Sequence, residues 1–178
     1  MSRIQRNAYP IWLKLKCTGL FLTWALLNSA NAIELPSPKD PIILTVEGNV
    51  SIVNRGDHAA FDLSMLKALG AITVDTNTPW TDGVIRFKAV PLLKVLAATG
   101  ASGTSVIAHA LNDYKSIVPM SVLDKGHAYL AFEMNETLMT RRDKGPLWLI
   151  FPWSDHPEYL TPQMKIHAVW QLNKLRVQ

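Results

Sequence analysis

The sequence is nearly free of cysteine: Cys17 is the only one in 178 residues. It lies in an N-terminal segment with the features of an export signal, so cleavage of that segment leaves a chain without any thiol. Such a chain forms no disulfide, has no cysteine nucleophile and offers no thiolate to a metal. Disulfides are not needed at this size, because a domain of about 150 residues buries roughly two-thirds of its surface on folding.

The N-terminal segment, residues 1–32, has the three parts of a signal peptide. Basic residues come first, an apolar run covers residues 17–27, and small residues end the segment at Ala30-Asn31-Ala32. We therefore expect cleavage after Ala32 and a periplasmic protein. A retained membrane anchor is the alternative, but the apolar run is shorter than the ~20 residues that a spanning helix needs. Lys16 directly before Cys17 argues against a lipoprotein, because a small residue is expected there.

The chain without its predicted signal peptide also has no excess of basic or acidic residues. The whole chain has a net charge of +4, with 18 basic and 14 acidic residues. All the charges in residues 1–32 are basic, namely Arg3, Arg6, Lys14 and Lys16. The rest of the chain therefore has 14 basic and 14 acidic residues and no net charge. This balance argues against nucleic acid as a partner, since its binding needs a basic surface.

Motifs for metal or nucleophilic catalysis are missing as well. The five histidines are scattered and form no His-x-x-x-His pair, so we expect no metal site. No serine stands in a G-x-S-x-G turn of the kind that hydrolases use. Three tryptophans in or beside apolar strands are expected in the core: Trp148, Trp153 and Trp170.

The chain after the signal peptide is expected to form an extended arm and one domain. Three prolines in residues 33–41 predict the arm, and the domain follows over residues 42–178. Helices are predicted at 62–70, where Asp62 can cap the N-terminus, and at 91–100. Many short strands with few short helices indicate an α+β domain. The predicted strands are 42–48, 50–53, 71–75, 84–90, 105–110, 116–119, 129–134, 147–151 and one or two within 166–177.

The order of several segments resembles the molybdopterin-binding domain of sulfite oxidases. The segments are Tyr114–Pro119, Tyr129–Asn135 and Arg142–Pro146, followed by the strand 147–151 and Pro152. Upstream, residues 87–93 and 99–101 resemble the strand-then-helix segment of that domain. The resemblance covers about residues 42–177. It implies a single sulfite-oxidase-type domain with mixed β-sheets and a few short helices.

One departure from this family changes the expected chemistry. In its catalytic members, the loop that corresponds to residues 76–83 carries the cysteine that binds molybdenum. Here the loop reads Thr-Asn-Thr-Pro-Trp-Thr-Asp-Gly, and hydroxyl or amide groups are poor substitutes for a thiolate. Molybdenum is therefore not expected. The chain looks more like a branch of small periplasmic proteins that bind a pterin without metal. Some of these are sensors for a membrane-bound diguanylate cyclase or phosphodiesterase, which implies a signalling partner in the membrane.

Three loops, 76–83, 112–114 and 141–144, offer side chains for a flat pterin ring and its polar edge. Trp80 could stack on the ring or anchor its own loop. Asp113 could accept from the amino and ring nitrogens, and Asn112 could complement a carbonyl. The alternative for these two residues is an Asx-stabilised turn.

The resemblance supplies the other candidates. Tyr114 matches a family tyrosine near the metal, with a core tyrosine as the alternative. Arg142 and Lys144 belong to a basic run that would meet a cofactor phosphate in the family, because guanidinium groups suit phosphate oxygens. A solvated loop is the alternative for this run. Lys165 corresponds more weakly to a family lysine.

These observations favour a non-catalytic periplasmic protein that binds a pterin or a molybdopterin-like ligand and signals to a membrane partner. Two alternatives stay open. One is a molybdopterin-dependent oxidoreductase with an atypical metal ligand. The other is a structural or assembly protein with an empty pocket.

Overall fold

The computed structural model describes residues 34–178. The predicted signal peptide and its cleavage site lie outside the described residues. Within the described part, no helix is long and apolar enough to cross a membrane.

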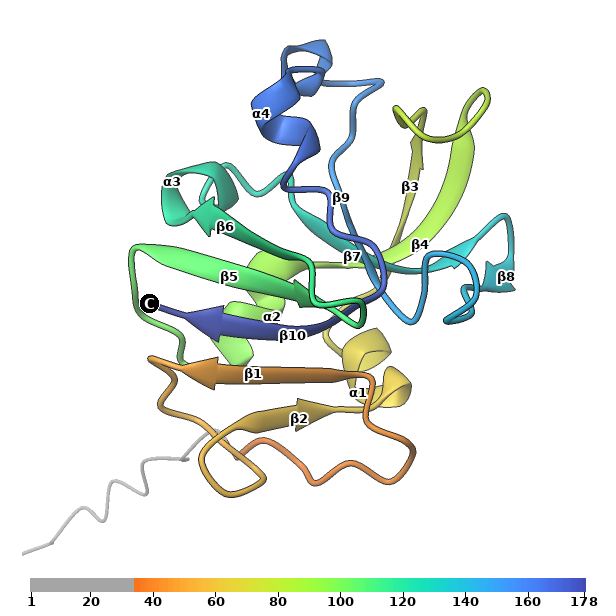
Figure 1. The fold of residues 1–178 in the computed structure, drawn as a ribbon. Coiled ribbons are helices and arrows are strands. Elements are labelled where there is room, and N and C mark those ends of the chain that lie inside the picture. Colours follow the sequence, from red (N-terminus) through yellow and green to blue (C-terminus); the bar gives the residue numbers. More distant parts are fainter. Residues whose placement is uncertain (1–33) are drawn as a thin grey trace, which may run out of the picture. The chain divides into compact units, whose positions relative to one another are not determined.

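The first of two β-sheets in residues 34–178 has the strand order β2-β1-β10-β5-β6 (Figure 1). Strand β1 pairs in parallel with β10, and the other neighbours are antiparallel. The turn from β5 to β6 is short, so the residues at its tip stay at one end of the sheet. The strands are β1 (Leu44–Gly48), β2 (Ala59–Phe61), β5 (Ser105–Ala110), β6 (Lys115–Pro119) and β10 (Leu172–Val177).

The second sheet is antiparallel and has the order β3-β4-β7-β8, with β9 also paired to β7. The loop between β3 and β4 stands at one end of this sheet (Figure 1). The strands are β3 (Ile72–Thr76), β4 (Ile85–Pro91), β7 (Tyr129–Met134), β8 (Thr137–Leu138) and β9 (Trp148–Ile150).

Short helices connect the strands. Asp62 caps α1 (Leu63–Ala68) by accepting from the backbone N–H of Met65 at 2.8 Å, as predicted. Pro91 precedes α2 (Leu92–Ala98), and both helices contact β4. Two further helices, α3 (Met120–Leu123) and α4 (Pro162–Lys165), and the 3-10 turn η1 (Pro157–Tyr159) were not predicted. The fold class predicted from the sequence, a mixed α+β domain with a few short helices, is confirmed.

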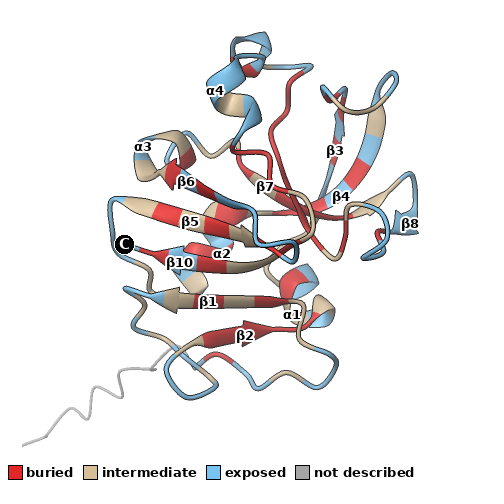
Figure 2. Ribbon diagram, viewed as in Figure 1, coloured by how far each residue is buried: buried red, intermediate tan, exposed pale blue. Residues whose placement is uncertain are grey.

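The core lies against the inner faces of the strands (Figure 2). In β1 and β5 buried and part-exposed residues alternate, as expected for strands with one face on the core. All three residues of β9 are buried, because β9 lies in the interior. Four large aromatic side chains in the core are shielded from water: Phe61, Phe87, Trp148 and Trp153.

One predicted strand is wrong, and the last predicted segment contains a single strand. Residues 50–53 form no strand, because the N–H groups of Ser51 and Ile52 donate to the carbonyl of Thr99 instead of to a neighbouring strand. Strand β2 lies further along the chain at Ala59–Phe61. In the segment 166–177 only Leu172–Val177 is a strand. The preceding residues continue from α4, and Ala168 N–H donates to the carbonyl of Lys165.

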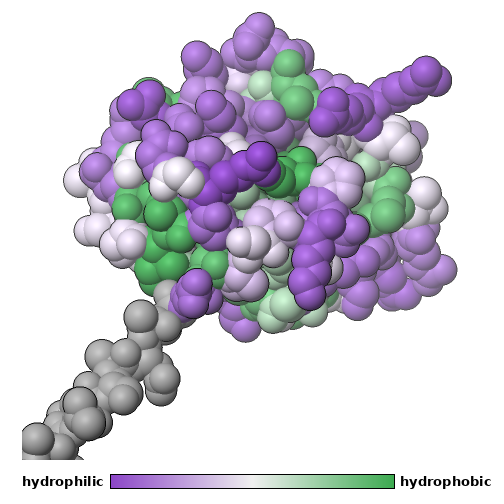
Figure 3. Space-filling model, turned by 90° about the horizontal axis from the view of Figure 1, so that it is seen from below, coloured by the Kyte–Doolittle hydropathy of each residue, from purple (hydrophilic) through white to green (hydrophobic). Residues whose placement is uncertain are grey.

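The predicted arm runs without regular structure to β1 and is attached to the start of α1. The backbone N–H groups of Lys39 and Asp40 donate to Oδ2 of Asp62, at 2.8 and 3.2 Å. Seen from below, the surface is largely hydrophilic, with hydrophobic residues in separate patches (Figure 3).

Candidate functional site

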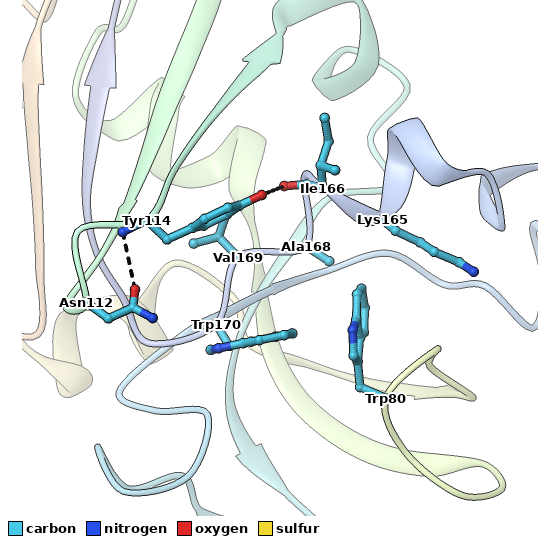
Figure 4. A pocket seen from close by; sticks show the side chains of 8 residues that line it. All are labelled: Trp80, Asn112, Tyr114, Lys165, Ile166, Ala168, Val169 and Trp170. Carbon is cyan, nitrogen blue, oxygen red and sulfur yellow. Dashed lines mark hydrogen bonds between the residues drawn. The ribbon is translucent and has the colours of Figure 1, made fainter.

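A cavity of about 370 Å³ opens where three segments of the chain meet. They are the β3–β4 loop, the β5–β6 turn, and the chain from the end of α4 to β10. The volume lies at the lower end of the ~300–1,000 Å³ of small-molecule sites, and a largely apolar lining with a few polar groups is typical of them. The lining residues are Trp80, Asn112, Tyr114, Lys165, Ile166, Ala168, Val169 and Trp170 (Figure 4).

The β3–β4 loop is fixed by hydrogen bonds at its base. Ser154 Oγ accepts from the N–H of Asn77 at 2.9 Å, and the N–H of Ser154 donates to Thr76 Oγ1 at 2.9 Å. Within the loop, Thr78 Oγ1 accepts from the N–H of Trp80 at 3.1 Å. These bonds join two loops that are far apart in sequence and place the Trp80 indole at the cavity.

The Trp80 ring packs edge-on against a cluster of tryptophans. Its ring centroid lies 5.4 Å from that of Trp170, 5.9 Å from Trp153 and 6.0 Å from Trp148. The side chain is half-buried and also lines the cavity. Both interpretations of Trp80 therefore describe its position: it anchors its loop, and it presents an aromatic surface to the cavity.

Trp170 lines the same cavity, although the sequence predicts it in the core. Its ring is half-buried and crosses that of Trp80 at 80°. The apolar residues before it favoured a core position. The following residue, Gln171, was the available signal, since glutamine is mostly exposed and indicates a chain near the surface.

The β5–β6 turn contributes Asn112 and Tyr114 but not Asp113 to the lining. Asp113 has a φ of 65°, in the left-handed region, and is exposed. Asn112 Oδ1 accepts from the N–H of Tyr114 at 3.3 Å, so the oxygen of Asn112 stabilises the turn. This is the Asx-stabilised turn that the sequence offered as the alternative. Its Nδ2 group has no hydrogen-bond partner among residues 34–178 and remains available to a ligand.

Tyr114 is a surface residue, not a core tyrosine: 45% of it is exposed. Its hydroxyl donates to the backbone carbonyl of Ile166 at 2.9 Å. Figure 4 shows this bond closing one side of the cavity, with Trp170 between Tyr114 and Trp80. Tyr114 therefore offers the face of its ring, because its hydroxyl hydrogen is already donated.

The predicted basic residues have different positions. Arg142 is exposed and does not line the cavity. Lys144 also lies outside the lining, and its Nζ stands over the rings of Trp148 and Trp170, 5.0 and 4.8 Å from their centroids. Lys165 is the one charged residue of the described chain in the lining. The cavity therefore has a positive charge and no carboxylate to balance it.

A buried histidine lies between two residues of the cavity wall in the sequence. His167 is only 4% exposed, and its Nδ1 is 2.9 Å from the hydroxyl oxygen of the buried Ser116. Burial lowers the pKa of His167. Its neighbours in sequence, Ile166 and Ala168, both line the cavity, so this side chain helps to fix the wall to β6.

The side chains at the expected molybdenum position do not fit a molybdenum ligand. Thr76 and Thr78 are buried, and their hydroxyls are hydrogen-bonded to Ser154 and Thr81 within the protein. Neither has the soft, charged sulfur that binds such a metal. In the part of the chain that the structure describes, no three His, Cys, Asp or Glu residues form a metal-binding group.

No protein-family model matches this chain, and neither does any curated protein. The fold defines a mixed α+β domain with two sheets and few short helices. Among solved structures, it is similar to the sulfane dehydrogenase SoxCD from Paracoccus pantotrophus, with a TM-score of 0.56 and 19% identity. The match covers 82% of this chain and 40% of that chain. A likeness at this identity establishes the fold, and the chain spans less than half of the similar protein.

Proposed function

We propose that this protein binds a pterin or a closely similar flat heterocycle in the cavity, without molybdenum and without catalysing a redox reaction. One observation carries the proposal. Two indole rings, of Trp80 and Trp170, line the same cavity as Lys165 and as Asn112, whose Nδ2 group has no partner among residues 34–178. An aromatic wall with a few directed polar groups suits a flat ring with a polar edge.

The ring geometry limits how such a ligand is held. The centroids of Trp80 and Trp170 are 5.4 Å apart and their planes cross at 80°, so no ring fits between them. A ligand ring therefore lies against the face of one indole and meets the edge of the other. The Nδ2 group of Asn112 can donate to a carbonyl on the ring edge. Lys165 can bind a negatively charged substituent.

A molybdopterin-dependent oxidoreductase is the second candidate, and the similarity to a sulfane dehydrogenase supports it. The residues of this chain fit its ligand only in part. Aromatic and basic groups are present for a pterin with an anionic substituent, but Thr76 and Thr78 are poor ligands for molybdenum. The donor chemistry therefore favours a metal-free ligand.

We further propose that the protein is exported and reports ligand occupancy to a membrane partner of the cyclase or phosphodiesterase type. The basic, apolar and small-residue parts of residues 1–32 support export. N-terminal sequencing of the protein from the periplasmic fraction should begin at Ile33, and a cytoplasmic uncleaved chain would contradict export. Crosslinking in intact cells should join the protein to such an enzyme in a pterin-dependent way; ligand-independent crosslinking would contradict sensing.

Variants of the two available polar groups test the binding site. We expect Asn112→Ala and Lys165→Met each to weaken pterin-6-carboxylate binding about threefold to tenfold, the usual effect of one hydrogen bond or ion pair. Quenching of tryptophan fluorescence measures the affinity. The matched controls are Asn49→Ala and Lys94→Met, at exposed positions outside the cavity. Equal affinities in all four variants, or no binding by the unchanged protein, would overturn the proposal.

A further inference from the structure

Lys144 occupies an unusual place for a charged side chain. Its Nζ stands 5.0 Å from the ring centroid of Trp148 and 4.8 Å from that of Trp170, whose planes cross at 80°. The ammonium group therefore lies in the corner between two indoles. The resemblance to the sulfite oxidase domain implied that Lys144 contacts a ligand phosphate, but Lys144 does not line the cavity. Any effect on a ligand must pass through Trp170, which does.

The backbone around Lys144 is fastened to the chain that carries Trp170. The N–H of Gln171 donates to the carbonyl of Lys144 at 2.8 Å. The side-chain Nε2 of Gln171 donates to the carbonyls of Arg141 and Asp143, at 2.8 and 3.3 Å. These three bonds fix residues 141–144 beside the Trp170 ring, so the position of the ammonium group is set by the fold.

The two indoles differ in burial. Trp148 is fully buried in β9, while Trp170 is half-buried at the edge of the cavity. A cation attracted to both faces ties the half-exposed ring to the fixed one. The same cation draws the π electrons of Trp170 toward itself, and therefore away from the side on which a ligand stacks. An electron-poor surface stacks best on an electron-rich ring.

We propose that Lys144 is a positioning residue that acts through Trp170 and makes the cavity prefer electron-rich flat heterocycles, namely reduced pterins, over oxidised ones. This inference rests on the proposed function and defines its ligand more narrowly. Reduction of the pyrazine half of a pterin makes the ring system richer in electrons while leaving the edge read by Asn112 in place. The charge of Lys165 cannot produce this preference, since it acts on a substituent.

The test compares 7,8-dihydrobiopterin with biopterin, which carry the same side chain. Affinities are measured by fluorescence quenching without oxygen. We expect the unchanged protein to bind the dihydro form about threefold to tenfold more tightly, in keeping with the size of cation–π effects. Lys144→Met keeps the length of the side chain and should reduce the ratio to about one, and Lys144→Arg should restore it. An unaltered ratio in Lys144→Met would overturn the inference.

A matched control is available in Lys125, whose Nζ stands 5.8 Å from the ring centroid of Tyr159, outside the cavity. Lys125→Met should leave the ratio unchanged, and an equal loss there would mean that Lys144 has no specific part. Fluorine NMR of 5-fluorotryptophan protein adds a ligand-free readout: Lys144→Met should move and broaden the Trp170 signal but not that of Trp153. If the unchanged protein binds neither pterin, the proposed function and the ligand preference fail together. A Trp170 signal that does not move rejects the positioning role by itself.

Discussion

Two cavities of nearly equal size differ in their walls, and only the second contains a buried carboxylate that holds segments of the chain together. The candidate site has about 370 Å³, and a second cavity between the arm and α1 has about 340 Å³. In the second cavity, Asp62 is 1% exposed and accepts hydrogen bonds from Ser64 Oγ and three backbone N–H groups. In the candidate site, Asn112 Nδ2 and Lys165 Nζ have no partner among residues 34–178. Neither volume nor unpaired polar side chains separate the two cavities, since Ser37 and Lys39 of the arm cavity also have no side-chain partner among residues 34–178. The buried, hydrogen-bonded Asp62 does separate them.

The aromatic content of the walls also separates the two cavities. The lining of the arm cavity is mainly aliphatic around Phe61, and its carboxylate holds two segments of the chain together. The candidate site has two indoles and a tyrosine ring at its surface. We conclude that the arm cavity belongs to the structural attachment of residues 34–41, while the candidate site is the one proposed to bind a ligand.

The largest effect is expected at Asp62. Burial alone would raise the pKa of Asp62, but hydrogen bonds from Ser64, Met65, Lys39 and Asp40 outweigh it and hold the pKa well below its usual range. Asp62→Ala leaves these donors unpaired, so the free energy of unfolding should fall by about 3 kcal/mol. Urea unfolding measures this, and pterin affinity should not change. A loss of pterin affinity in the folded variant would contradict the assignment of a purely structural role to the arm cavity.

A substitution of Trp80 tests the candidate site. We expect Trp80→Ala to weaken pterin binding about tenfold or more, because a stacking surface is removed. Met65→Ala in the arm cavity is the matched control and should leave binding unchanged. Circular dichroism checks that both variants are folded. Binding that survives in Trp80→Ala at full strength would show that the ligand binds elsewhere.

His167 predicts a smaller, pH-dependent effect on the wall of the candidate site. Burial lowers the pKa of His167, so below about pH 6.5 the unfolded chain takes up a proton more readily than the folded one. Stability is therefore full above that pH and falls as the pH drops toward the folded pKa, with a slope of at most about 1.4 kcal/mol per pH unit. His167→Gln should make the unfolding free energy less steep between pH 7 and 5. An unchanged slope would exclude His167 as the source.

Asp113 should show the smallest effect. Its φ of 65° is one that glycine adopts easily, and the side chain lies outside the lining. We expect Asp113→Gly to change the free energy of unfolding by less than about 1 kcal/mol and to leave pterin affinity unaltered. Thermal unfolding and fluorescence titration check both. A clear loss of pterin affinity would show that Asp113 takes part in binding, as the sequence analysis predicted.

Much of the fold could be predicted because its signals are local. Asp62 caps α1, Pro91 precedes α2, and the strand 105–110 was predicted with the observed bounds. Strand β2 was missed because three residues are too short for a periodic pattern. Helix α4 had a usable signal in Thr161 before Pro162, a cap followed by a favoured first residue.

The candidate site could be predicted only in part. The loops 76–83 and 112–114 both supply lining residues, as expected from their polar composition between strands. The segment 141–144 does not, because the bonds of Gln171 hold it on the side of Trp170 outside the cavity. That arrangement depends on contacts between residues about 30 positions apart, which no local pattern in the sequence encodes.

The most direct test of the central claim is an assay of what the protein carries. The full chain is expressed in bacteria that make molybdopterin and purified without added ligand. Small molecules released by denaturation are then identified by mass spectrometry, and molybdenum is measured in the same sample. We expect a pterin in near-equal amount to the protein, with a larger reduced than oxidised share, and molybdenum far below that amount. Molybdenum equal to the protein, or an empty protein that binds no added pterin, would contradict the account.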